Sequence, residues 1–385
     1  MKNRKMKLIA ALLCLCLLTA CGGEKETAVE VPAAAETPAA KTPMPAETPA
    51  AETTVPAETP VPETPDLSEI LAVSDPDEIK AELSAAMEQL RQPRVMELTD
   101  VELENPEIDV KNIYYSITAE SPELKYAYDL SARTEGNELH CQISYMPYKT
   151  GDFPADFSGL EISSLHGLIS AAEENIGSEP VAVRITDPNL DPDTMNLALL
   201  QAGGGYLYCG LNNDATAINY SAPYNMSMED CLSALAQADA LAEELVSRLI
   251  TEGMSDRDKA EALYSYVTAN VEYDQRYYSD RNAMPYESQT AVGALRDGLA
   301  ICGGYSHAIK LLFEKAGIPC YNVSGVCQGE NHMWNIAEID GEWLWFDATM
   351  DRGSDGEFGF LRFALTELDK SKYQWNEDTV AALLK

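Results

Sequence analysis

The chain is 385 residues long and has a formal net charge of −36, because 63 acidic residues outnumber 27 basic ones. A surface this acidic repels phosphate backbones, which argues against nucleic acid as a partner. The same charge favours solubility outside the cell. The first 66 residues have the composition of a leader and a linker, and the roughly 320 that remain are enough for two domains.

Residues 1–20 have the organisation of a signal peptide. Four of the first seven residues are basic, and the apolar run Leu8–Leu18 is too short to span a bilayer. Leu18-Thr19-Ala20-Cys21 resembles a bacterial lipobox, which implies cleavage before Cys21 and a lipid on its sulfur. An ordinary signal peptide also ends in small residues, but the polar linker directly after Cys21 favours a lipoprotein. We therefore predict a lipid anchor in the cell membrane, with the chain facing outside the cytoplasm.

Residues 21–66 are predicted to be the lipidated cysteine and a disordered tether. From Glu24 to Asp66 the chain is almost wholly Ala, Pro, Glu, Thr and Val, and a Pro-Ala-Glu-Thr-Pro unit recurs at Pro45 and Pro56. Such a segment buries too little apolar surface to fold. Its reach is on the order of 100 Å when extended, which suits lifting a domain through a cell-wall layer.

Residues 67–225 are predicted to form a small α+β domain. Apolar spacing indicates a helix around Val110–Ile117, and alternation on both sides of Glu135-Gly136-Asn137 indicates a hairpin. The pattern then predicts a helix, a strand, a second helix and two more strands, at Ser164–Gly177, Val181–Thr186, Asp191–Ala202, Tyr206–Leu211 and Thr216–Tyr220. Substrate positioning, wall binding and simple spacing remain open as roles of this domain.

Residues 226–385 are predicted to form a second domain that opens with two helices. Ser227 caps a run through Leu249, and Ser255 with Asp258 begins the next helix. A third helix begins at Cys302, which glycines surround and which an amphipathic run follows. Unpaired N–H groups and the positive end of the helix dipole favour a thiolate at such a position.

Three strand-like runs follow this helix, at Cys320–Cys327, His332–Ile339 and Glu342–Thr349. Asp340-Gly341, between the last two, is typical of a two-residue hairpin turn. That turn pairs Ile339 with Glu342, and the register can be counted back from there.

The counted register makes His332 and Asp347 diagonal neighbours on one face, with backbones roughly 7–8 Å apart. A three-residue turn would send the two side chains to opposite faces of the sheet. The sequence therefore predicts a triad of Cys302 as nucleophile, His332 as base and Asp347 as orienting carboxylate. A lone buried cysteine is more often inert, which we expect of the other cysteines after the tether: Cys141, Cys209, Cys231, Cys320 and Cys327.

These residues resemble the transglutaminase-like superfamily, whose fold is papain-like. The family blocks are a glycine shortly before Cys-x-Gly-Tyr-x-x-Ala, then His-x-Trp-Asn, Asp-Gly-x-Trp and Asp-x-Thr. The matching residues are Gly298, Cys302, Gly304, Tyr305, Ala308, His332, Trp334, Asn335, Asp340, Gly341, Trp343, Asp347 and Thr349. The resemblance covers roughly residues 255–374.

The resemblance implies an α+β fold in which the nucleophile helix packs on an antiparallel sheet. It assigns the nucleophile, base and orienter to Cys302, His332 and Asp347. Gln289, in the loop before Cys302, is a candidate second oxyanion donor beside the Cys302 N–H, or else a solvated amide. Trp334 is a candidate for the wall of the substrate cleft, or else a core residue.

We expect no metal and no cofactor. The acidic tail after Thr349 fails as a calcium loop, because Gly353 and Arg362 stand where ligands are required.

The expected function is that of a cell-surface cysteine enzyme acting on amide bonds of peptides, proteins or cell-wall peptides through an acyl-enzyme. Sequence does not choose between hydrolysis and transamidation, because loop shape forms the acceptor site. One alternative is a binding or scaffold module that kept the fold without turnover, which the complete triad argues against. Another is a transporter's solute-binding lipoprotein, which leaves the triad blocks unexplained.

Overall fold

The computed structural model describes residues 69–177, 179–357 and 359–385. The leader and tether predicted for residues 1–20 and 21–66, with the lipidation site Cys21, lie outside the described residues. Chain contacts divide the protein into Met1–Asp66 and Leu67–Lys385, and the elements that follow all belong to the second unit. Within the described ranges, no helix has both the length and the apolar character that crossing a membrane requires.

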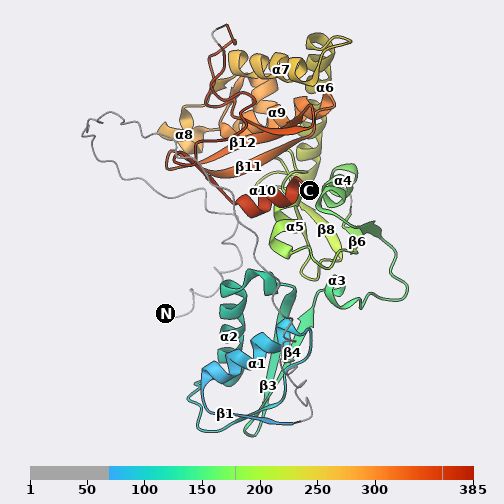
Figure 1. Cartoon of the computed structure of the whole chain (residues 1–385), viewed down its shortest axis with the longest axis vertical. Helices are drawn as coiled ribbons and strands as arrows, with labels where there is room; N and C mark the ends of the chain where they lie inside the picture. The colour runs from blue at the N-terminus through green and yellow to red at the C-terminus, as the bar shows by residue number, and fades with distance from the viewer. Residues whose placement is uncertain (1–68, 178, 358) are drawn as a thin grey trace, which may run out of the picture. The chain divides into compact units, whose positions relative to one another are not determined.

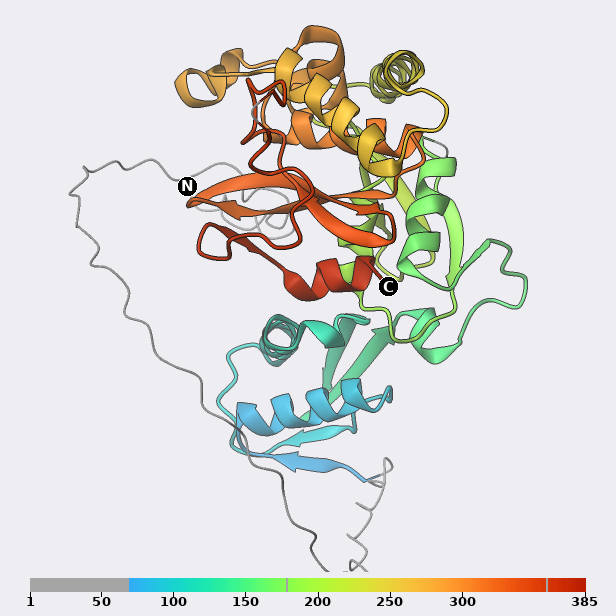
Figure 2. The ribbon, with the colours of Figure 1, turned by 45° about the horizontal axis from the view of Figure 1, so that its top comes forward.

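The first sheet has the strand order β1-β2-β4-β3, and helices α1 and α2 cover one face of it (Figures 1 and 2). The hairpin expected around Gly136 is confirmed, since Glu135 pairs with Glu138 across it. The helix expected around Val110–Ile117 is α2. The elements are β1 (Leu71–Val73), α1 (Pro76–Glu88), β2 (Met96–Leu98), α2 (Pro106–Glu120), η1 (Pro122–Leu124), β3 (Ala127–Glu135) and β4 (Glu138–Tyr145).

A second sheet follows, with the order β5-β6-β8-β7. The side chains of Ser164 and Asp191 cap the helices α4 and α5, as the sequence predicts, by accepting hydrogen bonds from backbone N–H groups. The elements are α3 (Pro147–Thr150), β5 (Leu160–Ile162), α4 (Leu165–Glu174), β6 (Val181–Ile185), α5 (Pro192–Leu199), β7 (Tyr208–Leu211) and β8 (Ala217–Ser221). The described elements from β1 to β8 are thus α+β, but they form two separate sheets.

The third sheet has the order β13-β12-β11-β14, and helix α9 packs against β11 and β12. Helices α6 and α7 pack on α9 in turn (Figure 1). The main elements are α6 (Met228–Leu249), α7 (Asp256–Asn270), α9 (Cys302–Lys315), β11 (Cys320–Cys327), β12 (Glu330–Ile339), β13 (Glu342–Phe346) and β14 (Tyr373–Trp375). This is the α+β core, with a nucleophile helix on an antiparallel sheet, that the sequence predicts.

Short elements complete the chain. They are β9 (Glu272–Tyr273), α8 (Arg276–Ser279), η2 (Arg281–Ala283), η3 (Tyr286–Gln289), η4 (Gly293–Asp297), β10 (Leu299–Ala300) and α10 (Glu377–Leu383). Strands β9 and β10 pair in parallel, and this pairing brings the chain from the end of α7 to the start of α9. The start of α9 is therefore held by β10 as well as by strands β11 and β12 of the third sheet.

A buried polar network joins α9 to the sheet. The Asn335 amide donates to the Ser306 carbonyl at 3.0 Å and to Asn322 Oδ1 at 2.9 Å. Asn322 Nδ2 lies 3.1 Å from Nδ1 of His307, which is half-buried. The Asn322 backbone also exchanges two hydrogen bonds with the Gln201 side chain, at 2.8 and 3.0 Å. These contacts cross the domain boundary predicted near residue 225, which itself stays a prediction.

His307 should make folding stability depend on pH. Burial, with a smaller contribution from the nearby Lys310 charge, lowers the pKa of His307 from 6.5 to about 4. The native ring is then neutral while the unfolded ring takes up a proton, so stability is full above pH 6.5 and falls as pH drops towards 4. The expected loss over this window is on the order of 3 kcal/mol.

His307→Gln removes the titrating ring but keeps an amide that can bond to Asn322. Urea unfolding of both proteins at about pH 7.5 and about pH 5 should show a smaller acid-induced loss in the variant. His166→Gln, the same change in another helix, is the matched comparison. Identical pH dependence in wild type and His307→Gln would contradict the assignment.

Candidate active site

The turn between β12 and β13 has the predicted geometry. Asp340 and Gly341 both have positive φ, at 54° and 85°, as a type I′ turn requires. Ile339 pairs with Glu342, and the ladder continues to Asn335 and Phe346 in the predicted register. Strand β13 ends at Phe346, earlier than the predicted Thr349, because the Asp347 N–H bonds instead to the Arg362 carbonyl at 3.0 Å.

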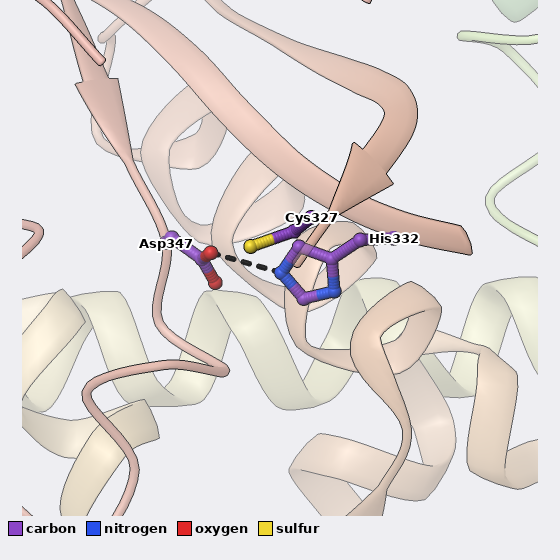
Figure 3. A group of neighbouring side chains, drawn as sticks. All are labelled: Cys327, His332 and Asp347. Atoms are coloured by element: carbon purple, nitrogen blue, oxygen red, sulfur yellow. Dashed lines mark hydrogen bonds and ion pairs between the residues drawn. The ribbon is translucent and has the colours of Figure 1, made fainter. Parts of the chain in front are cut away.

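The structure brings His332 and Asp347 into direct contact. His332 Nε2 lies 2.8 Å from Asp347 Oδ2, and the two side chains are 9% and 1% exposed. Figure 3 shows the imidazole and the carboxylate pointing toward each other from β12 and from the end of β13. A buried carboxylate in this position fixes the orientation of the ring and favours its protonated form.

Tyr373, on the edge strand β14, holds the same carboxylate. Its hydroxyl donates to Asp347 Oδ2 at 2.8 Å, and the Met350 N–H donates to Oδ1 at 3.2 Å. Sequence reasoning missed Tyr373, because β14 has only three residues and no periodic pattern marks it. Both oxygens of the orienting carboxylate are thus occupied, and its direction is determined by β14 as well as by β12.

Cys302 stands at the first position of α9, partly exposed, as predicted. Its thiol lies close enough to the His332 ring to influence the pKa of that ring. Because Nε2 of the ring bonds to Asp347, the remaining nitrogen, Nδ1, is the one available to the thiol. Burial disfavours the charged ring, but hydrogen bonds from His332 to Asp347 and to Cys302 outweigh it and raise the pKa of His332 to about 10.

Gln289 lies beside the first turn of α9. A Cβ built on Gly303 would be 3.1 Å from the Gln289 carbonyl oxygen and 3.7 Å from its Cβ. The preceding residue anchors the segment, because the Ile301 N–H donates to the Ser288 carbonyl at 2.7 Å and Ser288 Oγ donates to Asp274 at 2.6 Å. This is the neighbourhood that an oxyanion donor would need.

The assignment of Trp334 to the wall of a substrate cleft is wrong. The indole is 0% exposed, so it lies in the core. It stacks on the His332 ring at 5.8 Å between centroids and meets Tyr373 edge-on at 5.3 Å. Gly325 on the neighbouring strand leaves the room for it, since a Cβ there would be 2.8 Å from the indole. Trp334 therefore packs against one face of the His332 imidazole.

Three tyrosines that the sequence did not single out gather beside Cys302. Tyr273 stacks on Tyr278, and Tyr277 meets both edge-on. Burial raises the pKa of the Tyr273 and Tyr277 hydroxyls, and the proximity of Cys302 adds to the effect. Tyr278 is 58% exposed and donates to Glu330 at 3.0 Å. Of this tyrosine cluster, Tyr278 is thus the member that solvent reaches, while Tyr273 and Tyr277 are half-buried.

A cysteine at the start of a helix, a histidine on a strand and an aspartate just after the next strand form the arrangement of a papain-like cysteine enzyme. Residues 243–348, which contain all three, match the model of the transglutaminase-like superfamily. The chain therefore carries a transglutaminase-like domain.

Two curated relatives match part of this chain. Kyphoscoliosis peptidase of Mus musculus is 25% identical over 134 residues, which is 31% of this chain and 20% of that protein. The Homo sapiens kyphoscoliosis peptidase is 24% identical over 123 residues, 29% of this chain and 18% of that protein. The chain thus spans about a fifth of the length of these relatives. Among solved structures, a crystal structure of a TGase is 20% identical, with a TM-score of 0.28 over 44% of this chain and 51% of that one.

Gly304→Ala tests how closely the Gln289 segment packs on α9. A Cβ at this position would lie 2.6 Å from the Ser288 carbonyl oxygen and 3.0 Å from that of Thr290, so backbone must move. We expect a loss of about 2 kcal/mol in urea unfolding, together with slower alkylation of Cys302.

Gly167→Ala is the matched control. Gly167 is the third residue of α4, as Gly304 is of α9, but its Cβ would meet only Ser164 Oγ at an ordinary 3.4 Å. Alanine there should be neutral or slightly stabilising. Equal stability losses in the two variants would show that the effect at Gly304 is not one of close packing.

Proposed function

We propose that the protein is a cysteine enzyme that acts on amide bonds of peptides or proteins through an acyl-enzyme. The observation that carries this proposal is the 2.8 Å contact between His332 and Asp347 with Cys302 beside the same ring at the start of α9. A nucleophile, a base and an orienting group in this order form the minimum set for nucleophilic catalysis.

In the first half-reaction, the Cys302 sulfur attacks the amide carbonyl carbon, and the carbonyl electrons move onto oxygen. The Cys302 N–H, which has no acceptor within its own helix because α9 begins there, is placed to stabilise this oxyanion, with Gln289 as the second donor. His332 then gives its proton to the departing amine, the carbon–nitrogen bond breaks, and a thioester remains on Cys302.

In the second half-reaction, His332 takes a proton from an incoming nucleophile, which attacks the thioester and releases the thiol. Water as nucleophile makes the protein a peptidase or amidase, and an amine makes it a crosslinking transamidase. Tyr278, the exposed member of the tyrosine cluster, supplies stacking area for a peptide in either case.

The site of action that we propose is the outer face of the cell membrane. The basic and apolar leader, Cys21 and the proline-rich tether support this placement. Peptides of the cell wall and exposed proteins are then the substrates within reach, and the acidic chain gives no support for a nucleic-acid partner.

The reactivity of Cys302 distinguishes an enzyme from a scaffold that kept the fold. With iodoacetamide at about pH 7, we expect Cys302 to be alkylated faster than the half-exposed Cys141, which serves as the internal reference. His332→Ala should slow Cys302 at least about tenfold, and Asp347→Asn should also slow it, because the base or its orientation is lost. Peptide mapping by mass spectrometry gives both rates in one digest. A sluggish Cys302 that is indifferent to His332 would favour the scaffold.

Trapping the acyl-enzyme identifies the reaction. Incubation with a library of peptides and cell-wall fragments, followed by acid quenching, should leave an acyl adduct on Cys302 that intact-mass measurement detects. Cys302→Ser, which lacks the thiol, is the control and should give no thioester. Added amine that appears in the product indicates transamidation, and free acid alone indicates hydrolysis. No adduct from any fragment would contradict the proposed chemistry.

A further inference from the structure

A second thiol lies against the His332–Asp347 pair. Cys327, at the end of β11, has its sulfur near both side chains, and one donor atom from each of the three residues lies within 4.8 Å of the others. Figure 3 shows this sulfur directed toward the imidazole and the carboxylate. We expected Cys327 to be an inert core residue, and nothing in the proposed acyl transfer uses it.

We propose that Cys327, His332 and Asp347 form a binding site for a thiophilic divalent cation such as Zn²⁺, and that occupation of this site switches the enzyme off. The inhibitory consequence rests on the proposed function, whereas the metal site itself does not.

The donor set and its spacing fit zinc. One thiolate, one imidazole and one carboxylate are all ordinary zinc ligands, with bonds of about 2.0–2.3 Å, so neighbouring donors in a tetrahedral site are about 3.3–3.6 Å apart. The pair His332 Nε2–Asp347 Oδ2, at 2.8 Å, would have to open slightly, and donors as far apart as 4.8 Å would have to close by about 1 Å.

The surroundings already support such ligands. The Tyr373 hydroxyl holds Asp347 Oδ2 at 2.8 Å, as partners behind metal ligands do, and Tyr373 stands opposite Cys327 in the pairing of β14 with β11. On binding, the Cys327 thiol proton passes to solvent, and the two negative ligands balance the charge of the cation. The site is buried, because Cys327 is 5% exposed and the Asp347 side chain 1%.

Metal at this position and catalysis exclude each other. The cation would take Nε2, the nitrogen that now bonds to Asp347, and the only remaining ring proton would then sit on Nδ1, facing Cys302. A ring in that state accepts no proton from the thiol or from an incoming nucleophile. The base is lost although Cys302 itself is not bound to the metal.

Cobalt titration tests the site without any substrate. In Cys302→Ser, which removes the other thiol near His332, Co²⁺ should produce a sulfur-to-cobalt charge-transfer band and the intense visible bands of four-coordinate cobalt. The band should disappear when Cys327→Ser or His332→Gln is added, with circular dichroism confirming that each variant is folded. It should persist when Cys141→Ser is added, since Cys141 is the half-exposed thiol most open to adventitious binding.

Zinc protection of the native thiol supplies the second readout. Zn²⁺ should slow alkylation of Cys302 at least about tenfold relative to the metal-free rate of the same protein. In Cys327→Ser, Zn²⁺ should leave the alkylation rate of Cys302 unchanged. No cobalt band in Cys302→Ser, or a band that survives Cys327→Ser, would overturn the metal site. Zinc protection that persists in Cys327→Ser would place the ion on Cys302 and overturn the switch. An unreactive Cys302 with a normal cobalt band would instead refute only the proposed function.

Discussion

The register of β12 against β13 is the constraint on which the site depends. It is set by two adjacent residues of positive φ, Asp340 and Gly341, whose turn matches the twist of the strands. A slip of one residue would carry Asp347 to the other face of the sheet and leave its carboxylate buried without the imidazole. The turn lies at the far end of the hairpin, so a local backbone preference decides a contact several residues away.

Packing against α9 converts this hairpin into a three-part site. Asn335 ties the His332 strand to the nucleophile helix by donating to the Ser306 carbonyl. On the other side, the glycines that follow Cys302 let the backbone of Ser288–Thr290 approach the first turn, at a cost of about 1 kcal/mol each in helix propensity. Glycines at the start of α9 are thus the condition for placing Gln289 beside the first turn of the helix.

Opposing electrostatic effects act on the protonation of the His332 ring. Burial favours the neutral ring, while Asp347 on one nitrogen and Cys302 on the other favour the charged one and raise its pKa to about 10. The carboxylate sustains this because Tyr373 and the Met350 N–H hold its two oxygens. The Cys327 sulfur lies beside the same ring and the same carboxylate. A site built to orient an imidazole therefore also resembles a site that ligates a metal.

The sequence by itself determined the local parts: helix caps such as Ser164 and Ser227, the turn at Asp340–Gly341, the start of α9 at Cys302, and through the turn the pairing of His332 with Asp347. Each follows from neighbouring residues, since caps, turns and periodicity act over a few positions. Only the tertiary structure decided that Trp334 is core, that Tyr373 holds the carboxylate and that Cys327 joins it. These depend on which face of a strand other elements cover and on contacts between β11, β12 and β14, which no local pattern encodes.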